Sequence, residues 1–360
     1  MVQFTQIDAT PRDDSLEAAI STRLGDLDSG KYRRNNAFVL RQFAEFIRHE
    51  EDATEVREIT AGTLRKYARV LREATTEEDT ITASTAEQYW AIVSAFLSWS
   101  VREELLEKNP AQLTRASEPL PDSDEETNRQ FWSERERDAV CATADKVVDD
   151  LLEDNHTQRE KRTAFRDRAL VYTLAYTGCR GAELASVSAD EKRNGVRWAD
   201  VNLEEGIISV YGKTRTRQDS PIFEPAIDPL ERWQNVVEPL DEWPVFPSGH
   251  LPSLYACLPE DVQGNQEAIW KQLREYDCTP PAVSTEGVRR ILTELCAQSD
   301  YEFDEPLKPH GARRGLGDAL YQEQAELAQE TLRHQNIKTT HESYREERTR
   351  QIKERGDELF

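Results

Sequence analysis

The sequence from Pro309 to Tyr344, PHGARRGLGDALYQEQAELAQETLRHQNIKTTHESY, carries the signals around which the rest of the chain can be interpreted. It holds three histidines, an adjacent pair of arginines and a late tyrosine, separated by residues of helical character. His310 and Arg313 are three residues apart, so on a helix they share a face. His334 precedes a short polar turn, and Tyr344 follows ten residues later. These residue types suit a reaction in which cations stabilise a phosphate while a phenol attacks it. An arginine-rich surface helix explains this stretch alone equally well.

Length and composition favour two domains and leave nucleic acid open as a partner. The chain has 360 residues, of which 37% are hydrophobic and 32% charged, and its net charge is −23. Of the 46 basic residues, 35 are arginine and 11 lysine, and the acidic excess is spread along the chain. Diffuse acidity with few lysines predicts a halophilic protein adapted to high cytoplasmic salt. At molar salt the Debye length is only about 3 Å, so local clusters matter more than net charge.

The cysteines and the terminal sequence indicate a cytoplasmic protein. The five cysteines are scattered and form no CxxC pair, which argues against a disulfide framework or a zinc site. No apolar run approaches the roughly 18 residues of a membrane span. The N-terminal sequence MVQFTQIDATPRDDS lacks the basic and apolar regions of a signal peptide. We therefore expect no membrane contact.

The first third of the chain predicts only helices. Apolar residues recur there at helical spacing, and polar residues suited to capping precede the runs. The predicted helices are 15–24, 31–49, one begun by the N-cap Thr60, and one capped by Thr82 or Ser84. Asn109-Pro110 ends this unit, because proline disfavours helix in the residue before it. Residues 15–114 are thus expected to form a bundle of four or five helices.

The rest of the chain predicts a second, mainly helical domain with one small sheet. The segment 117–128, SEPLPDSDEETN, is the expected linker between a first domain at 1–116 and a second at 129–360. Ser133 and Glu136 form a capping-box pattern, and a strong helix from Phe165 ends at Gly178. The other predicted elements are a short helix with Arg180 and Glu183, strands at 196–203, 206–211 and 219–223, and a helix at 284–298. Residues 225–281 give no clear pattern.

Four segments carry further basic or nucleophilic groups: TGCRGAEL, YGKTRTRQDSPI, PHGARRG and LRHQNIKTTHESY. In this order they resemble the tyrosine recombinase (phage integrase) family, including its Xer-like members. That family has an arginine in a T-G-x-R-x-x-E-L turn, a lysine in a β-hairpin, an H-x-x-R pair, and a histidine before a nucleophilic tyrosine. The matching residues here are Arg180 with Glu183, Lys213, His310 with Arg313, His334 and Tyr344. The resemblance covers about residues 15–345, with one residue more between His334 and Tyr344 than is usual.

The resemblance implies a fold and an activity. We expect a SAM-like helical core-binding domain and an α+β catalytic domain of the DNA breaking-rejoining fold. The expected enzyme is a site-specific DNA recombinase that works through a 3′-phosphotyrosine in integration, excision or resolution. Arg180 and Arg313 suit phosphate because a guanidinium binds two oxygens and stays charged. His310 and His334 would donate hydrogen bonds, and His310 could also take the proton of the tyrosine. Lys213 would protonate the leaving 5′-hydroxyl, Glu183 would hold Arg180 or a neighbouring group in place, and Tyr344 would attack.

Partners and alternatives follow from the same residues. The expected partner is double-stranded DNA. Four copies of the protein, each a monomer when free, would assemble on two DNA sites. No cofactor or metal is expected. Candidate DNA contacts are Arg33, Arg34, Lys66, Arg69 and Arg314. One alternative is a catalytically silent, site-specific DNA-binding protein of the same fold. Another is a type IB topoisomerase-like enzyme.

Overall fold

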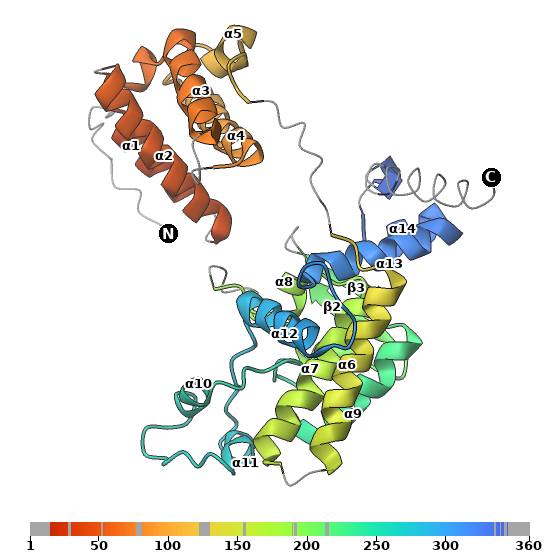
Figure 1. The fold of residues 1–360 in the computed structure, drawn as a ribbon. Helices are drawn as coiled ribbons and strands as arrows, with labels where there is room; N and C mark the ends of the chain where they lie inside the picture. The colour runs from red at the N-terminus through yellow and green to blue at the C-terminus, as the bar shows by residue number, and fades with distance from the viewer. Residues whose placement is uncertain are drawn as a thin grey trace, which may run out of the picture. The chain divides into compact units, whose positions relative to one another are not determined.

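The computed structural model describes residues 15–27, 30–51, 53–76, 81–121, 130–153, 156–188, 190, 193–212, 216–334, 336–338, 340–341 and 344. The chain folds as two compact units, Met1–Thr127 and Asn128–Phe360. Figure 1 shows the helices and strands of each unit. Lys213, part of the predicted linker and the tail after Tyr344 lie outside the described residues. None of the described helices is both long enough and apolar enough to cross a membrane.

The first unit is helical throughout its described part. It contains α1 (Leu16–Asp26), α2 (Lys31–Glu50), α3 (Ala61–Thr76), α4 (Ala83–Arg102) and α5 (Thr114–Ser117), with 3₁₀ turns at Val56–Glu58 and Pro110–Gln112. The predicted caps are present: the Thr60 hydroxyl accepts from Thr63 N at 3.2 Å, and the Thr82 hydroxyl accepts from Thr85 N at 3.2 Å. The apolar stripes of these helices meet in one core that includes Leu40, Phe43 and Phe96.

Asn109 fixes the end of this bundle. Its side-chain amide donates to Ser94 O at 3.0 Å and to Ser98 Oγ at 2.8 Å, and its carbonyl oxygen accepts from Ala111 N at 2.8 Å. One side chain thereby ties α4 to the 3₁₀ turn that begins at Pro110.

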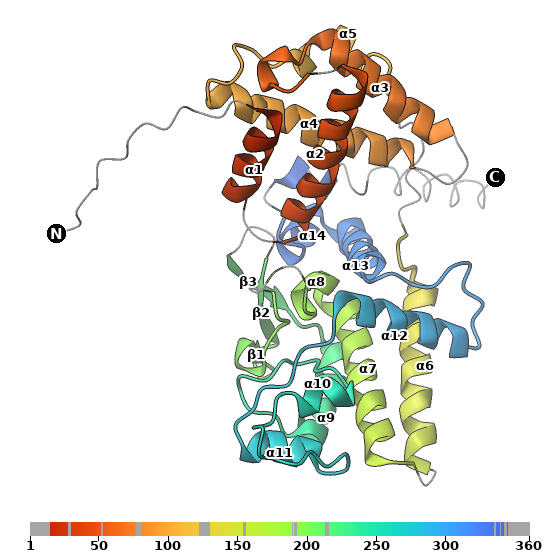
Figure 2. The same cartoon turned by 90° about the vertical axis from the view of Figure 1, so that its left-hand side faces the viewer.

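The second unit combines nine helices of the described chain with one small sheet. The helices are α6 (Glu134–Glu153), α7 (Gln158–Thr177), α8 (Gly181–Leu184), α9 (Ile227–Val237), α10 (Leu251–Tyr255), α11 (Ile269–Glu275), α12 (Thr285–Gln298), α13 (Pro309–Glu323) and α14 (Ala325–Thr331). The capping box at Ser133 and Glu136 is present, with Ser133 N donating to Glu136 Oε2 at 2.8 Å. The long helices α6 and α7 run through the unit, with α8, α13 and α14 at one end and α11 at the other (Figures 1 and 2).

The sheet is antiparallel in the order β1-β2-β3, with β1 at Val201–Asn202, β2 at Ile207–Tyr211 and β3 at Arg217–Pro221. The predicted first strand, 196–203, was too long. Residues 196–198 pair with the segment around Pro244 through Trp198 N to Trp243 O, and Trp198–Asp200 then form a 3₁₀ turn, closed by Asp200 N donating to Arg197 O at 3.0 Å. The expected fold class is confirmed: a helical domain precedes a mainly helical domain with a small antiparallel sheet.

Candidate active site

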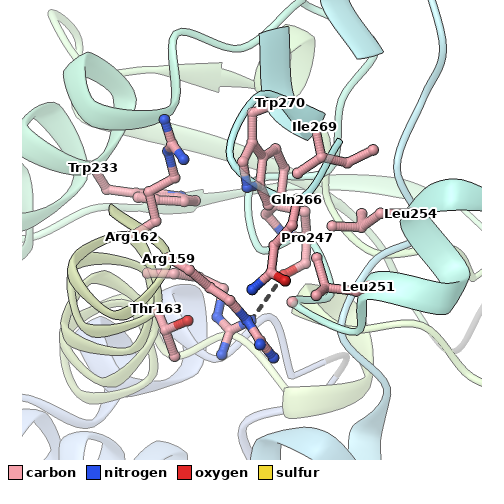
Figure 3. A pocket seen from close by; sticks show the side chains of 12 residues that line it. Arg159, Arg162, Thr163, Trp233, Pro247, Leu251, Leu254, Gln266, Ile269 and Trp270 are labelled. Carbon is pink, nitrogen blue, oxygen red and sulfur yellow. Dashed lines mark hydrogen bonds between the residues drawn. The ribbon is translucent and has the colours of Figure 1, made fainter. Parts of the chain in front are cut away.

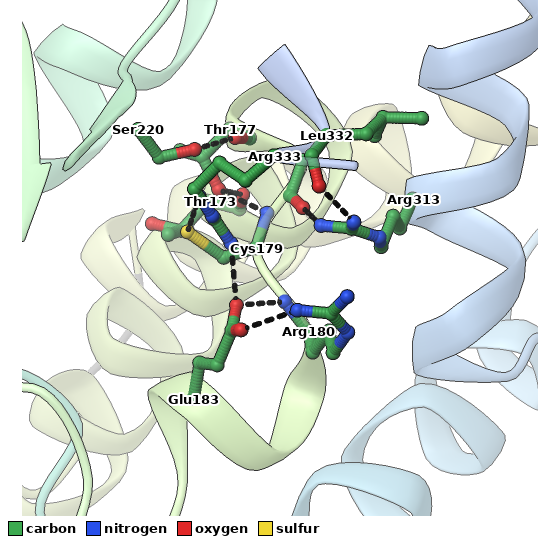
Figure 4. A network of polar contacts seen from close by, with 10 residues as sticks. Thr173, Thr177, Cys179, Arg180, Glu183, Ser220, Arg313, Leu332 and Arg333 are labelled. Carbon is green, nitrogen blue, oxygen red and sulfur yellow. Dashed lines mark hydrogen bonds and ion pairs between the residues drawn. The ribbon is translucent and has the colours of Figure 1, made fainter. Parts of the chain in front are cut away.

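The site begins where α7 ends. The Thr177 hydroxyl donates to Thr173 O at 2.6 Å and accepts from Cys179 N at 3.2 Å. Gly178 has a φ of 65°, the left-handed conformation that glycine adopts without steric cost. Ser220 of β3 donates its hydroxyl to Thr177 O at 2.7 Å, which ties the sheet to this turn (Figure 4). The turn delivers Arg180 to the N-cap position of α8.

Glu183 holds Arg180 through both of its carboxylate oxygens. Arg180 donates its backbone N–H to Oε2 at 2.8 Å and its Nη1 to Oε1 at 2.7 Å. The Glu183 side chain is 3% exposed and the Arg180 side chain 32%, so the carboxylate covers one edge of a guanidinium that otherwise reaches solvent. The predicted role of Glu183 as the residue that holds Arg180 is consistent with this contact.

Arg313 joins two segments that are far apart in sequence. Its Nη1 donates to Gly178 O and its Nη2 to Leu332 O, and the residue is 2% exposed. Burial, and after it the positive charge of Arg180, lower the pKa of Arg313 to about 10, so it remains charged at neutral pH. Arg180 and Arg313 therefore lie on facing sides of one small cationic site (Figure 4).

The two predicted histidines border this cationic site. His310 lies in the first turn of α13, and His334 shares a 2.9 Å hydrogen bond between Nδ1 and Thr340 Oγ1. Desolvation is the main cause that lowers the pKa of His334 to about 4, and Arg313 and Arg180 add to it. Desolvation and the neighbouring guanidinium groups also lower the pKa of His310 to about 4. Both imidazoles are thus neutral at pH 7 until a negative charge enters the site.

Arg333 is the residue of this cluster that the sequence motifs did not single out. Arg333 N donates to Glu330 O and His334 N to Gln329 O, both at 3.0 Å, which is the hydrogen-bond pattern that commonly ends a helix at glycine. Arg333 has a φ of 53° there, which costs an L-residue about 1–2 kcal/mol. Its side chain is 5% exposed and donates Nη2 to Glu183 Oε2 at 2.6 Å. The sequence alone held no signal for this residue, because basic residues are common near helix C-termini.

Tyr344 is buried beside the cationic site rather than exposed in it. The residue is 2% exposed, and its ring packs against Phe131 and Tyr321 with centroid distances of 6.2 and 5.6 Å. A Cβ on Gly317 would lie 2.1 Å from the Tyr344 hydroxyl, so the phenol lies directly against the backbone of α13. Burial raises the pKa of Tyr344 to about 12, although the charge of Arg313 opposes this shift. Arg313 is therefore close enough to influence the phenol, which is neutral in this state.

The predicted DNA-contacting residues differ in their exposure and in the contacts that their side chains already make. Arg33, Arg34 and Arg69 are exposed on α2 and α3, whereas Lys66 is held in a 2.5 Å ion pair with Glu51. Arg314 of α13 is half-buried, and its Nη1 donates to Gln130 O at 3.5 Å. The structure tests none of these predicted DNA contacts, since an exposed ion pair such as that of Lys66 is weak and exchanges readily with a phosphate.

A second cluster of arginines lies at the far end of α7. Arg159 and Arg162 line a cavity together with Trp233 and Trp270 (Figure 3). The cavity volume is about 20 Å³, room for about one water molecule, so it is too small to hold a substrate or cofactor. Within the described part of the chain, no three His, Cys, Asp or Glu side chains gather as metal ligands would.

Both units of the chain are similar in sequence to known protein families. Residues 143–351 match the profile of the phage integrase family, and residues 16–116 match that of the phage integrase SAM-like domain. Tyrosine recombinase XerC of Mycobacterium sp. (strain JLS) is 26% identical over 306 residues, covering 84% of this chain and 83% of the relative. Tyrosine recombinase XerD of Halalkalibacterium halodurans is 22% identical over 309 residues, covering 84% and 82%.

Solved structures agree in fold. The Tn1549 transposon integrase in complex with a circular intermediate DNA gives a TM-score of 0.58 at 14% identity, covering 92% of this chain and 95% of that one. The XerH site-specific recombinase bound to palindromic difH substrate gives 0.57 at 14% identity, covering 94% and 82%. At such identities the likeness concerns the fold alone.

Proposed function

The chain belongs to the phage integrase family, and from this premise we propose which residues carry out its reaction, site-specific DNA recombination by a tyrosine recombinase. The Tyr344 oxygen attacks the phosphorus of a DNA phosphodiester, and the bond from phosphorus to the 5′-oxygen breaks. The product is a 3′-phosphotyrosine and a free 5′-hydroxyl. A 5′-hydroxyl from a second strand then attacks the phosphotyrosine and releases Tyr344. Each step exchanges one phosphate ester for another, so the number of phosphoester bonds is conserved.

The observation that carries this assignment is the cluster of Arg180, Glu183 and Arg313 beside His334. A pentacoordinate phosphate carries more charge than the diester, and preformed guanidinium donors stabilise that added charge. Arg180 is partly exposed and held at a fixed angle by Glu183, so it offers N–H groups to a phosphate without reorganisation. Arg313 has further N–H groups besides the two that bind carbonyls.

The histidines act with the phosphate in place. A phosphate beside His310 and His334 raises the pKa of each, since an adjacent negative charge favours the protonated ring. His334 then donates a hydrogen bond to a phosphate oxygen. His310 starts as the neutral ring: its N–H donates to a phosphate oxygen, and its other nitrogen takes the proton of the Tyr344 phenol. Lys213 delivers the proton to the leaving 5′-oxygen from its hairpin.

Tyr344 leaves its buried position before it attacks. Its phenol lies against Gly317 under Phe131 and Tyr321, where its raised pKa opposes formation of the phenolate. We place this arrangement before cleavage, and DNA binding would draw the phenol toward Arg313. The extra residue between His334 and Tyr344 adds length to the segment that must move.

The enzyme binds double-stranded DNA, and the exposed Arg33, Arg34 and Arg69 of the first unit contribute phosphate contacts. Four copies assemble on two DNA sites, so that strands cut by different copies can be exchanged. The acidic residues spread along the chain are compatible with DNA binding in a cytoplasm of high salt. Salt screens the net negative charge there, so that only charges close to a phosphate affect its binding.

The test is covalent trapping on DNA. A preferred site is first selected from a random duplex pool and then used as a nicked suicide substrate at several salt concentrations. The wild-type protein should form an adduct stable to denaturation, and Tyr344→Phe should bind the site without forming one. An equally good adduct from Tyr344→Phe would refute the assignment of the nucleophile. Specific binding without any adduct would favour the silent DNA-binding protein, and relaxation of supercoiled plasmid without site preference would favour the topoisomerase.

A further inference from the structure

The carboxylate of Glu183 is shared between two arginines. It accepts Arg180 on both oxygens and Arg333 on Oε2 at 2.6 Å (Figure 4). The Arg333 side chain is 5% exposed, with its Nη1 3.9 Å from the Cys179 sulfur. Arg333 is thus too enclosed to meet a DNA phosphate itself, and any effect it has on the reaction passes through Glu183.

This sharing changes the charge that a phosphate meets. Arg180 and Glu183 alone form a neutral pair, in which the carboxylate competes with the phosphate for the guanidinium. Arg333 adds one positive charge to the pair and takes part of the hydrogen-bonding capacity of Oε2. A carboxylate that is shared in this way binds Arg180 less tightly, so more of the cationic character of Arg180 is left for the substrate.

The same contact also fixes the backbone that carries His334. Arg333 lies at the left-handed position that ends α14, and His334 is the next residue. The ion pair to Glu183 anchors this turn to the α8 turn, in parallel with the Arg313 contacts to Gly178 O and Leu332 O. Two buried links therefore join the segment before His334 to the turn that holds Arg180.

We propose that Arg333 is a positioning residue, which shares Glu183 with Arg180 so that Arg180 faces the scissile phosphate as a cation and His334 stays beside it. The proposal rests on the proposed function, since it concerns the phosphate site of that reaction. It predicts that Arg333 affects the rate of strand cleavage more than the affinity for DNA.

Two substitutions separate this role from a purely structural one. Arg333→Gly removes the charge and also relieves the left-handed backbone, whereas Arg333→Lys keeps both the charge and the backbone constraint. Single-turnover cleavage of the nicked substrate is measured at saturating protein, and the dissociation constant is measured in the Tyr344→Phe background. Arg333→Gly should cleave about tenfold more slowly, with a dissociation constant within about twofold of the parent. Arg333→Lys should recover most of the rate. The control Arg232→Gln removes the same charge from an exposed position on α9 and should leave both quantities unchanged.

A double-mutant cycle tests the route through Glu183. In a Glu183→Gln background, Arg333→Gly should slow cleavage little further, because the shared charge is already absent. The thermal midpoint of each variant shows whether it is folded. A folded Arg333→Gly that cleaves at the wild-type rate, a Lys variant as slow as the Gly variant, or independent effects in the cycle would each overturn the role of Arg333. A wild-type protein that forms no adduct would overturn the proposed function, and the role of Arg333 with it.

Discussion

Replacing Gly317 by alanine should expel the Tyr344 ring from its buried position. Gly317 lies in the middle of α13, and the Tyr344 phenol lies directly against its backbone. An alanine Cβ would lie 2.1 Å from the Tyr344 hydroxyl and 2.5 Å from Leu332 Cδ1. Ordinary contacts between such atoms are about 3.5–4 Å, so both side chains must move. Leu332, which is completely buried, must shift within the core, and the Tyr344 ring, whose hydroxyl is the nearer atom, must leave its position.

The net effect on stability can be worked out from opposing contributions. Alanine in place of a helical glycine normally stabilises a protein by about 0.5–1 kcal/mol. Expelling the Tyr344 ring from its contacts with Phe131 and Tyr321 loses the burial of a large aromatic side chain, which contributes about 1.5–3 kcal/mol. We therefore expect Gly317→Ala to lower the free energy of unfolding by about 1–2 kcal/mol.

Two measurements test this reasoning. Denaturant unfolding gives the change in stability, and an absorbance titration of tyrosinate gives the pKa of Tyr344 when Tyr344→Phe is subtracted in each background. The pKa should fall from about 12 toward the ordinary value of 10 as the phenol becomes solvated. The control Gly62→Ala on α3 meets only Thr60 Oγ1, at 3.4 Å, and should be neutral or stabilising. A Gly317→Ala protein as stable as its parent, with an unchanged titration, would refute the assigned position of the phenol.

Three further predictions concern other parts of the molecule. Asn109→Ala loses three hydrogen bonds at the end of α4 and should lower the stability of the first unit by about 2–3 kcal/mol in denaturant unfolding. The control Asn336→Ala changes an exposed turn residue of the second unit and should alter the stability of that unit little. Gly315→Ala places a Cβ 2.1 Å from the Trp132 backbone oxygen, which a side-chain movement cannot relieve, so it should lower the free energy of unfolding by about 3 kcal/mol or more. Because the pKa of His334 is about 4 in the folded protein and 6.5 ordinarily, the unfolded chain takes up the proton first, and stability should fall as the pH drops from 6.5 to 4. The loss over that window should be smaller in His334→Gln, and an identical pH dependence in the two proteins would contradict the lowered pKa.

The helices and their caps were predictable because their causes are local. Thr60, Thr82 and Ser133 each accept a hydrogen bond from a backbone N–H within three residues, so the pattern of the sequence contains the whole interaction. Gly178 was predicted as a helix end for the same reason, and its φ of 65° agrees. The first strand was overextended because its pairing depends on a distant residue, Trp243, whose backbone oxygen captures Trp198 N.

The candidate site was predictable where an ordered motif existed. Arg180, Arg313 and His334 were picked by type and order, and the structure gathers all three. The surroundings of Tyr344 were not predictable, since Phe131 and Tyr321 reach it from segments far away in the sequence. Arg333 was missed because an arginine after a helix is unremarkable until its φ and its contact with Glu183 are known.

The contacts of the two principal arginines indicate which event precedes the chemistry. Arg313 is 2% exposed and uses its fork of N–H groups to hold the Gly178 and Leu332 carbonyls, a geometry that a lysine ammonium would not reproduce. Arg180 is 32% exposed and already oriented by Glu183, so it would be the first cation that an entering phosphate meets. Both cations therefore stand in place without DNA, whereas the phenol of Tyr344 is buried and neutral. Since the electrostatic part of the site is preformed, we expect the release of Tyr344 from α13, rather than the assembly of the cations, to control when cleavage begins.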